Sequence, residues 1–137
     1  MSCAVPVATA DDLAGIPLFE TLDADARAVT APWFEVQEVS RGVKLIGEGA
    51  PGYSFFVLRE GSATVTINGI EVRTLAPGDF FGELALLGDG QRTATVTAVS
   101  PSRVLVLFGT EFRRLQQEYP EIAAQIETNL REMAQAA

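Results

Sequence analysis

The sequence predicts a mainly β protein with flanking α-helices, built as a β-sandwich or a β-roll. From Phe34 to Phe108, apolar and polar residues alternate with the period of two that is typical of half-buried strands. Turn residues divide this region into short strands at regular spacing, and the period changes on both sides of it. The turn signals are Gly47–Gly52, Gly61, Asn68-Gly69, Pro77–Asp79 and Gly88–Gly90.

The N-terminal part predicts a flexible segment over residues 1–10 and short helices over residues 11–33. Thr9 is a suitable cap for a helix whose first turn is acidic, and Pro17 ends that helix. A second short helix is expected from Asp23 to Ala31. The apolar residues between the two helices are expected to anchor the core: Leu18, Phe19 and Leu22.

The strongest hairpin signal in the β region, residues 34–108, is Asn68-Gly69. The strand before it alternates apolar and threonine residues, and the strand after it alternates apolar or threonine residues with charges. The members of the second strand are Ile70, Val72 and Thr74 against Glu71 and Arg73. Two more strands are expected over residues 94–99 and 103–108.

The C-terminal segment, residues 109–135, predicts two helices with a break between them. The first runs from Thr110 to Tyr119, and the chain is expected to bend there because Tyr119 precedes Pro120. Pro120 suits the first turn of a new helix. That helix carries one apolar stripe, which could pack on the β region, serve as a mobile lid or form a dimer seam: Ile122, Ile126, Leu130 and Met133.

The composition fits one domain over residues 11–137 and excludes several kinds of function. The net charge of −8 opposes binding to nucleic acid, whose phosphates attract Lys and Arg. No histidine is present, so the commonest metal ligand and the commonest general base are both missing, and we expect no metal, no cofactor and no catalytic residue. Cys3 is the only cysteine, and no stretch is apolar enough to span a membrane, so we expect a cytoplasmic protein.

The segment from Phe80 to Ala98 carries most of the functional information. It places Glu83 and Arg92 nine positions apart, with a short apolar turn and a glycine-bracketed loop between them. An arginine fork and free N–H groups at a helix start suit a phosphate, and a fixed carboxylate suits a sugar hydroxyl. Gly82 lets the backbone approach a ligand closely. Without a ligand, the two charged side chains could also pair with each other.

This segment resembles the phosphate-binding cassette of cyclic nucleotide-binding domains, the family of kinase regulatory subunits, cyclic nucleotide-gated channels and catabolite-activator-type regulators. The resemblance rests on Phe81 to Leu87 and Arg92 to Val96, and it is supported upstream by Glu48 to Gly52 and the strand that follows. Tyr53 departs from the Asp that the family usually has there. The resemblance covers residues 11–135 and implies a jelly-roll-like β-roll (double-stranded β-helix), with the cassette over residues 80–96.

The resemblance also implies the ligand-binding residues. Glu83 would accept the ribose 2′-hydroxyl, Arg92 would bind the phosphate, and Thr93 would donate to the phosphate or to a base edge. Backbone and small-residue contacts would complete the site, and these are Phe81, Gly82, Leu84, Ala85 and Ala94. Leu75 and Val96 could line the base or belong simply to the core. The last helix would cover the base with one of its polar residues: Thr128, Asn129, Arg131 or Glu132.

The expected mechanism is a movement of the last helix. The ligand would draw the cassette helix inward, so that Leu86 or Leu87 repacks against Phe112. The break at Pro120 would then act as a hinge. The chain continues for 17 residues after Pro120, which leaves no room for a helix-turn-helix, so we expect a protein partner or self-association through the last helix and no direct contact with DNA.

The leading interpretation is therefore a non-catalytic sensor of a cyclic purine nucleotide, with cAMP favoured over cGMP. The chain could be free-standing or part of a larger protein such as an ion channel. Two alternatives stay open. One is a degenerate β-roll that serves as a protein-interaction module without nucleotide, and the other is a cupin-type β-barrel enzyme, which the lack of histidine disfavours.

Overall fold

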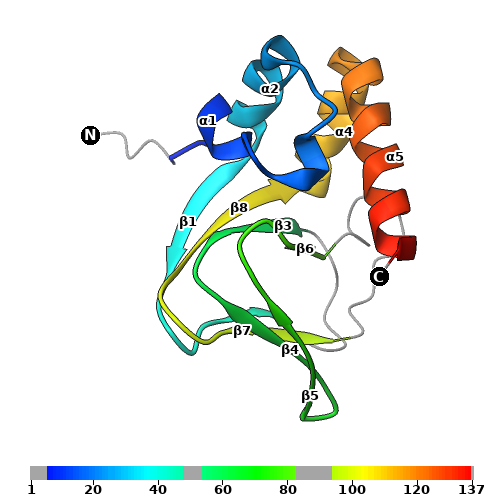
Figure 1. The fold of residues 1–137 in the computed structure, drawn as a ribbon. Helices are drawn as coiled ribbons and strands as arrows, with labels where there is room; N and C mark the ends of the chain where they lie inside the picture. Colours follow the sequence, from blue (N-terminus) through cyan, green and yellow to red (C-terminus); the bar gives the residue numbers. More distant parts are fainter. Residues whose placement is uncertain (1–5, 48–53, 83–93, 137) are drawn as a thin grey trace.

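Two antiparallel sheets and a layer of helices make up the computed structural model, which describes residues 6–47, 54–82 and 94–136. The helices gather on one side of the β-roll, and the β4–β5 hairpin extends from the other side (Figure 1). This architecture agrees with the predicted mainly β protein with flanking helices. Among the described residues, no helix is both long and apolar enough to cross a bilayer.

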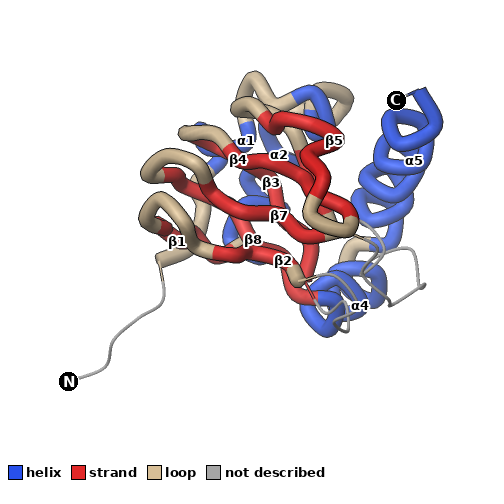
Figure 2. The backbone as a smooth tube through the Cα atoms, turned by 90° about the horizontal axis from the view of Figure 1, so that it is seen from below, coloured by secondary structure: helices blue, strands red, loops and turns tan. Residues whose placement is uncertain are grey.

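Each sheet has four strands within the described residues. The first sheet has the order β1-β8-β3-β6, with bounds Glu35–Val39, Ser102–Phe108, Ser54–Glu60 and Phe80–Phe81. The second has the order β2-β7-β4-β5, with bounds Lys44–Ile46, Thr95–Ala98, Ala63–Ile67 and Ile70–Leu75. Seen from below, the second sheet lies in front and α5 flanks it (Figure 2).

Short helices precede the first strand, as predicted. Thr9 caps α1, and the Asp12 carboxylate accepts the backbone N–H of Thr9 at 2.8 Å. Asp23 caps α2 by accepting the backbone N–H of Ala26 at 2.8 Å. The predicted anchors Leu18, Phe19 and Leu22 are all buried. The bounds are α1 Ala10–Leu13, η1 Pro17–Phe19, α2 Ala24–Thr30 and η2 Ala31–Trp33.

Two apolar clusters hold the layers together. The inner cluster lies between the sheets and consists of Ile46, Phe56, Leu58, Ala63, Leu75, Phe81, Val96, Val104 and Val106. The outer cluster joins the first sheet to the helices, and its strand members are Phe55, Val57, Leu105 and Leu107. Because successive side chains of a strand point to opposite faces, β3 and β8 contribute to both clusters. β3 and β8 are therefore buried on both faces.

The β4–β5 hairpin is the exposed part of the second sheet. Its turn residues Asn68 and Gly69 have φ angles of 53° and 79°, the left-handed pair that a type I′ turn requires. Val65 pairs with Arg73 but Thr66 pairs with Glu71, so Val72 is an extra residue, a β-bulge. β5, the exposed strand of this hairpin, lies at the edge of the second sheet.

The C-terminal helices are α4 (Gly109–Glu118) and α5 (Pro120–Ala136). Tyr119 separates them with φ −138° and ψ 67°, which confirms the predicted break. The apolar stripe of α5 packs against the outer cluster, in which Ile126 and Leu130 are fully buried. Of the three interpretations of this stripe, packing is therefore observed in this structure.

Candidate functional site

The candidate site is framed by the last residue of β6 and the first residue of β7. β6 belongs to the first sheet and pairs with β3, whereas β7 belongs to the second sheet and pairs with β2 and β4. The chain between them, residues 83–93, holds the predicted Glu83 and Arg92. These two residues lie outside the described residues, as do Leu84, Ala85, Leu86, Leu87 and Thr93.

Both sequence motifs border the same end of the β-roll. Gly47 follows β2, whose Ile46 pairs with Val96 near the start of β7. In the first sheet, the start of β3 lies beside the end of β6, where Phe56 pairs with Phe81. The β-roll therefore brings the residues that border 48–53 and 83–93 to one end, although these segments are about 35 positions apart in the sequence.

Two phenylalanines anchor the first border. Phe81 packs into the inner cluster, where its ring is stacked on Phe56 with centroids 4.9 Å apart and planes 6° apart. Phe80 points to the other face, against the outer cluster, with its ring 5.8 Å from that of Phe55. The first strand of the cassette is thus packed on both of its faces.

Gly82 ends this strand with φ 78°, a left-handed conformation that is strained for residues with a side chain. The sequence predicted a close backbone approach at this glycine. The positive φ gives a second reason for glycine here. On the other border, Ala94 is half-buried next to β7.

The two predicted apolar contacts of the base are members of the inner cluster. Leu75 is 1% exposed and Val96 is 3% exposed. Core packing, which was one of the two interpretations left open, therefore accounts for both side chains. Whether they also line a ligand stays a prediction.

Arg73 is a candidate that the sequence pattern did not reveal. Directly paired residues of an antiparallel ladder share a face, and Arg73 pairs with Val65, which packs against the inner cluster. Plain alternation would group Arg73 with Glu71, but the bulge at Val72 changes that grouping. Arg73 therefore lies on the same face of β5 as Leu75, two residues away, and its side chain is 53% exposed. Arg73 Nη2 lies 3.8 Å from Asp79 Oδ1.

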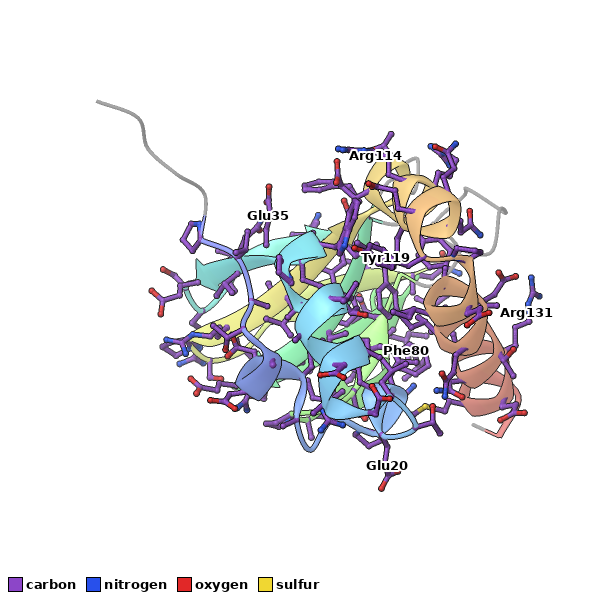
Figure 3. All side chains as sticks on the ribbon, turned by 90° about the horizontal axis from the view of Figure 1, so that it is seen from above. Glu20, Glu35, Phe80, Arg114, Tyr119 and Arg131 are labelled. Atoms are coloured by element: carbon purple, nitrogen blue, oxygen red, sulfur yellow. The ribbon has the colours of Figure 1, made fainter. Side chains whose placement is uncertain are left out.

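The predicted covering residues of α5 differ in their surroundings. Asn129 donates through Nδ2 to the backbone oxygen of Leu18 at 3.1 Å and to Thr21 Oγ1 at 2.7 Å, so its amide is engaged by the N-terminal part. Arg131 lies on the outer side of α5 (Figure 3), where it pairs with Glu127 at 2.9 Å. Thr128 and Glu132 are exposed. All four roles stay predictions.

Phe112 and Pro120 are the predicted relay and hinge residues that the structure describes, and their roles stay predictions. Phe112 of α4 is 2% exposed and belongs to the outer cluster, which Phe80 also packs against. Pro120 begins α5 directly after the break at Tyr119. The described residues contain no group of side chains that could hold a metal ion.

The comparison with protein families now adds to this geometry. Residues 36–119 match the model of the family described as cyclic nucleotide-binding domain. The chain belongs to this family. The match includes both motif segments, the two borders of the site and all of β6 and β7, so the resemblance that the sequence indicated is confirmed.

Curated relatives of this cyclic nucleotide-binding domain include kinase regulatory subunits. A cAMP-dependent protein kinase regulatory subunit from Colletotrichum orbiculare is 40% identical over 107 residues, which are 77% of this chain and 27% of that protein. The chain thus spans about a quarter of the length of that relative.

Solved structures with the same fold confirm the predicted jelly-roll-like β-roll. The N-terminal domain of a transcriptional regulator from Streptomyces coelicolor A3(2) has a TM-score of 0.78 and 28% identity, over 92% of this chain and 94% of that one. The regulatory domain of Toxoplasma gondii PKA, crystallised with cAMP, has a TM-score of 0.75 and 27% identity, over 90% of this chain and 48% of that one.

Proposed function

We propose that this chain is a non-catalytic sensor that binds a cyclic purine nucleotide at the end of the β-roll framed by β6 and β7, with cAMP favoured over cGMP. The observation that carries the proposal is the family match across residues 36–119. The match covers the cassette together with β6 of the first sheet and β7 of the second sheet. The cAMP-dependent relatives and the cAMP complex of a structural neighbour support the choice of nucleotide.

Glu83 and Arg92 have separate roles in this proposal. Arg92 binds the cyclic phosphate through charge-assisted hydrogen bonds, and Glu83 accepts the ribose 2′-hydroxyl. Backbone N–H groups of Gly82, Leu84 and Ala85 complete the phosphate site. The nucleotide brings its own phosphate and sugar, so the site needs neither a metal nor a general base.

Isothermal titration calorimetry with cAMP and cGMP tests this binding. Hydrogen bonds to a charged partner contribute about 1.5–3 kcal/mol, so we expect Arg92→Ala to weaken binding by about tenfold to a few hundredfold. Arg113→Ala, at an exposed arginine of α4, serves as the control and should bind like the wild type. Equal affinity of Arg92→Ala and wild type would contradict the phosphate assignment.

The choice between the two purines depends on Arg73 in this proposal. A guanidinium suits the O6 and N7 acceptors of guanine, whereas adenine presents an amino donor beside N7. Arg73 lies on the same face of β5 as Leu75, but Asp79 lies 3.8 Å from it and competes for its charge. We therefore expect cGMP to bind, but less tightly than cAMP.

Arg73→Ala should weaken cGMP binding by about tenfold and leave cAMP binding nearly unchanged, since one good base contact discriminates by about 1–3 kcal/mol. Asp79→Ala should remove the carboxylate that competes for the Arg73 guanidinium, so it should strengthen cGMP binding relative to cAMP binding. The measurement is the ratio of the two dissociation constants by calorimetry. A ratio that is the same in both variants and the wild type would remove Arg73 from the site.

The output of the sensor is a movement of α5 about Tyr119 and Pro120. A nucleotide can shift this equilibrium only by its different affinities for the two positions of the helix. The moved helix would be read by a protein partner or by a second copy in the cytoplasm, because a net charge of −8 opposes contact with nucleic acid. Equal hydrogen exchange of residues 120–135 with and without nucleotide would contradict this output.

A further inference from the structure

Two carboxamides of α5 bind the turn that follows η1. Gln125 and Asn129 are four positions apart, so they lie on one face of the helix. Asn129 Nδ2 donates to Leu18 O at 3.1 Å and to Thr21 Oγ1 at 2.7 Å. Gln125 Nε2 donates to Thr21 O at 3.1 Å. These three bonds join the two ends of the chain across more than 100 positions, and Figure 1 shows α5 beside the N-terminal helices.

The acceptors explain why these bonds matter. The last carbonyl groups of a helix lack donors within that helix, and Leu18 lies in the short η1 helix. Leu18 is fully buried, so its carbonyl group has little access to water. A buried acceptor that loses its donor destabilises the protein by more free energy than a typical hydrogen bond contributes.

Packing alone would hold α5 less specifically. Ile126 and Leu130 lie in the outer cluster, but apolar contact is not directional and permits sliding or rotation. Asn129 is nine residues from Pro120, which is about 13 Å along the helix axis. A bond at that distance from the break at Tyr119 resists any swing of the helix far better than a contact near the break.

We propose that Gln125 and Asn129 form a polar latch that restrains α5 from turning about Tyr119–Pro120 and couples its position to the turn from Leu18 to Thr21. When α5 moves, either this turn follows or the buried Leu18 carbonyl loses its donor. The regulatory meaning of the latch rests on the proposed function, in which nucleotide moves α5. The restraint itself is a property of the free protein.

Hydrogen exchange of the free full chain tests the restraint. The double variant with Gln125→Ala and Asn129→Ala should lose protection about five- to thirtyfold in residues 17–22 and 120–133. Alanine is the better helix former, so reduced helix propensity would not explain a loss in α5. Gln117→Ala, which removes an exposed carboxamide from α4, is the matched control and should leave both segments unchanged.

A milder variant guards against general unfolding. Thr21→Val removes one acceptor of Asn129 and keeps the shape of the side chain, so it should lower protection in the same two segments by less than the double variant. Unchanged protection in both variants would overturn the latch. A loss spread equally over β3 and β8 would also overturn it, because that result describes a fold stabiliser and not a restraint on one helix.

Addition of cAMP tests the coupling. We expect cAMP to change the exchange of residues 17–22 and 120–133 together in the wild type, and of residues 120–133 alone in the double variant. A wild-type response confined to residues 120–133 would show that the two segments are not coupled. If calorimetry shows no binding of cAMP or cGMP, the proposed function fails while the result on the free protein still decides the latch.

Discussion

The two sheets of this β-roll differ in how much of their surface is buried. Residues 55–58 of β3 and 104–107 of β8 are buried without interruption, because the inner cluster covers one face of the first sheet and the outer cluster covers the other. In the second sheet, β5 is exposed from Ile70 to Thr74, and only Leu75 at its end is buried. The central strands of the first sheet are buried on both faces, whereas the second sheet has one buried face and an exposed hairpin strand.

This difference separates stability from recognition. The inner cluster needs only one face of the second sheet, so the hairpin beyond it is free to carry charged and irregular residues such as Arg73 and the bulge at Val72. Bulges at sheet edges re-aim side chains and discourage pairing with other chains. The first sheet could not accept a bulge of this kind inside its buried run without disturbing two clusters at once.

The largest test of this comparison uses two isomeric side chains. Leu107→Ala in β8 removes a fully buried member of the outer cluster and should lower the free energy of unfolding by about 2–5 kcal/mol. Ile70→Ala in the hairpin removes the same number of carbon atoms from a residue that is 67% exposed, so it should cost less than about 1 kcal/mol. Urea unfolding of both variants measures the difference, and equal losses would refute the division of the two sheets.

The next test compares two turn glycines. Gly61 follows β3 of the first sheet, and a Cβ there would lie 2.2 Å from Ser102 Oγ and 2.7 Å from Pro101 O. Gly69 has a similar positive φ in the hairpin, but a Cβ there meets nothing within 4 Å. Gly69→Ala should therefore cost about 1–2 kcal/mol from backbone strain alone. Gly61→Ala should cost about 1–3 kcal/mol more, because its neighbours must move.

Thermal unfolding of both glycine variants makes this measurement. A third variant, Ser102→Gly, removes the nearest obstructing hydroxyl and provides the control. Combined with Gly61→Ala, it should recover part of the loss if the clash is the cause. A Gly61→Ala protein as stable as Gly69→Ala would mean that the turn can open away from Ser102 without cost.

Local features of the fold could be predicted from the sequence because their causes are local. The hairpin at Asn68-Gly69, the cap at Thr9 and the break at Tyr119 each depend on residues within a few positions. The grouping of strands into two sheets depends on pairs such as β1 with β8, which are far apart in the sequence and leave no periodic signal. The jelly-roll-like arrangement was predicted only through the family resemblance.

The residues of the candidate site also divide into those with a local cause and those that depend on distant parts of the chain. Phe81 and Gly82, which the motif marks, lie at the end of β6 and directly after it, and their contacts with a ligand stay predictions. Arg73 was missed although alternation places it on the face of Leu75, because a charged residue in an exposed strand is expected to be solvated. Asn129 was one of four candidates for covering the base, and its bonds to Leu18 and Thr21 come from a distant part of the chain, which no local pattern indicates.

The smallest expected effect is the response of the two sheets to pH. Histidine is the side chain whose ordinary pKa lies between 5 and 8, and the chain has none. In the first sheet, a hydrogen bond from Arg103 to Glu38, with the charge of Glu60 added, raises the pKa of the Arg103 guanidinium above its ordinary value. A raised pKa stabilises the fold below the unfolded pKa, and that stability is lost only as the pH rises through the still higher folded pKa.

The pKa of the Arg103 guanidinium lies far above neutral pH in both the folded and the unfolded chain. Its contribution to the free energy of unfolding is therefore constant between pH 6 and 8. We therefore expect the free energy of unfolding in urea to change by less than about 0.5 kcal/mol across this range. Hydrogen exchange corrected for the intrinsic effect of pH should likewise keep the same ratio of protection between β8 and β5. A ratio that changed with pH would mean that a titrating group in one sheet, and not burial alone, separates the stability of the two sheets.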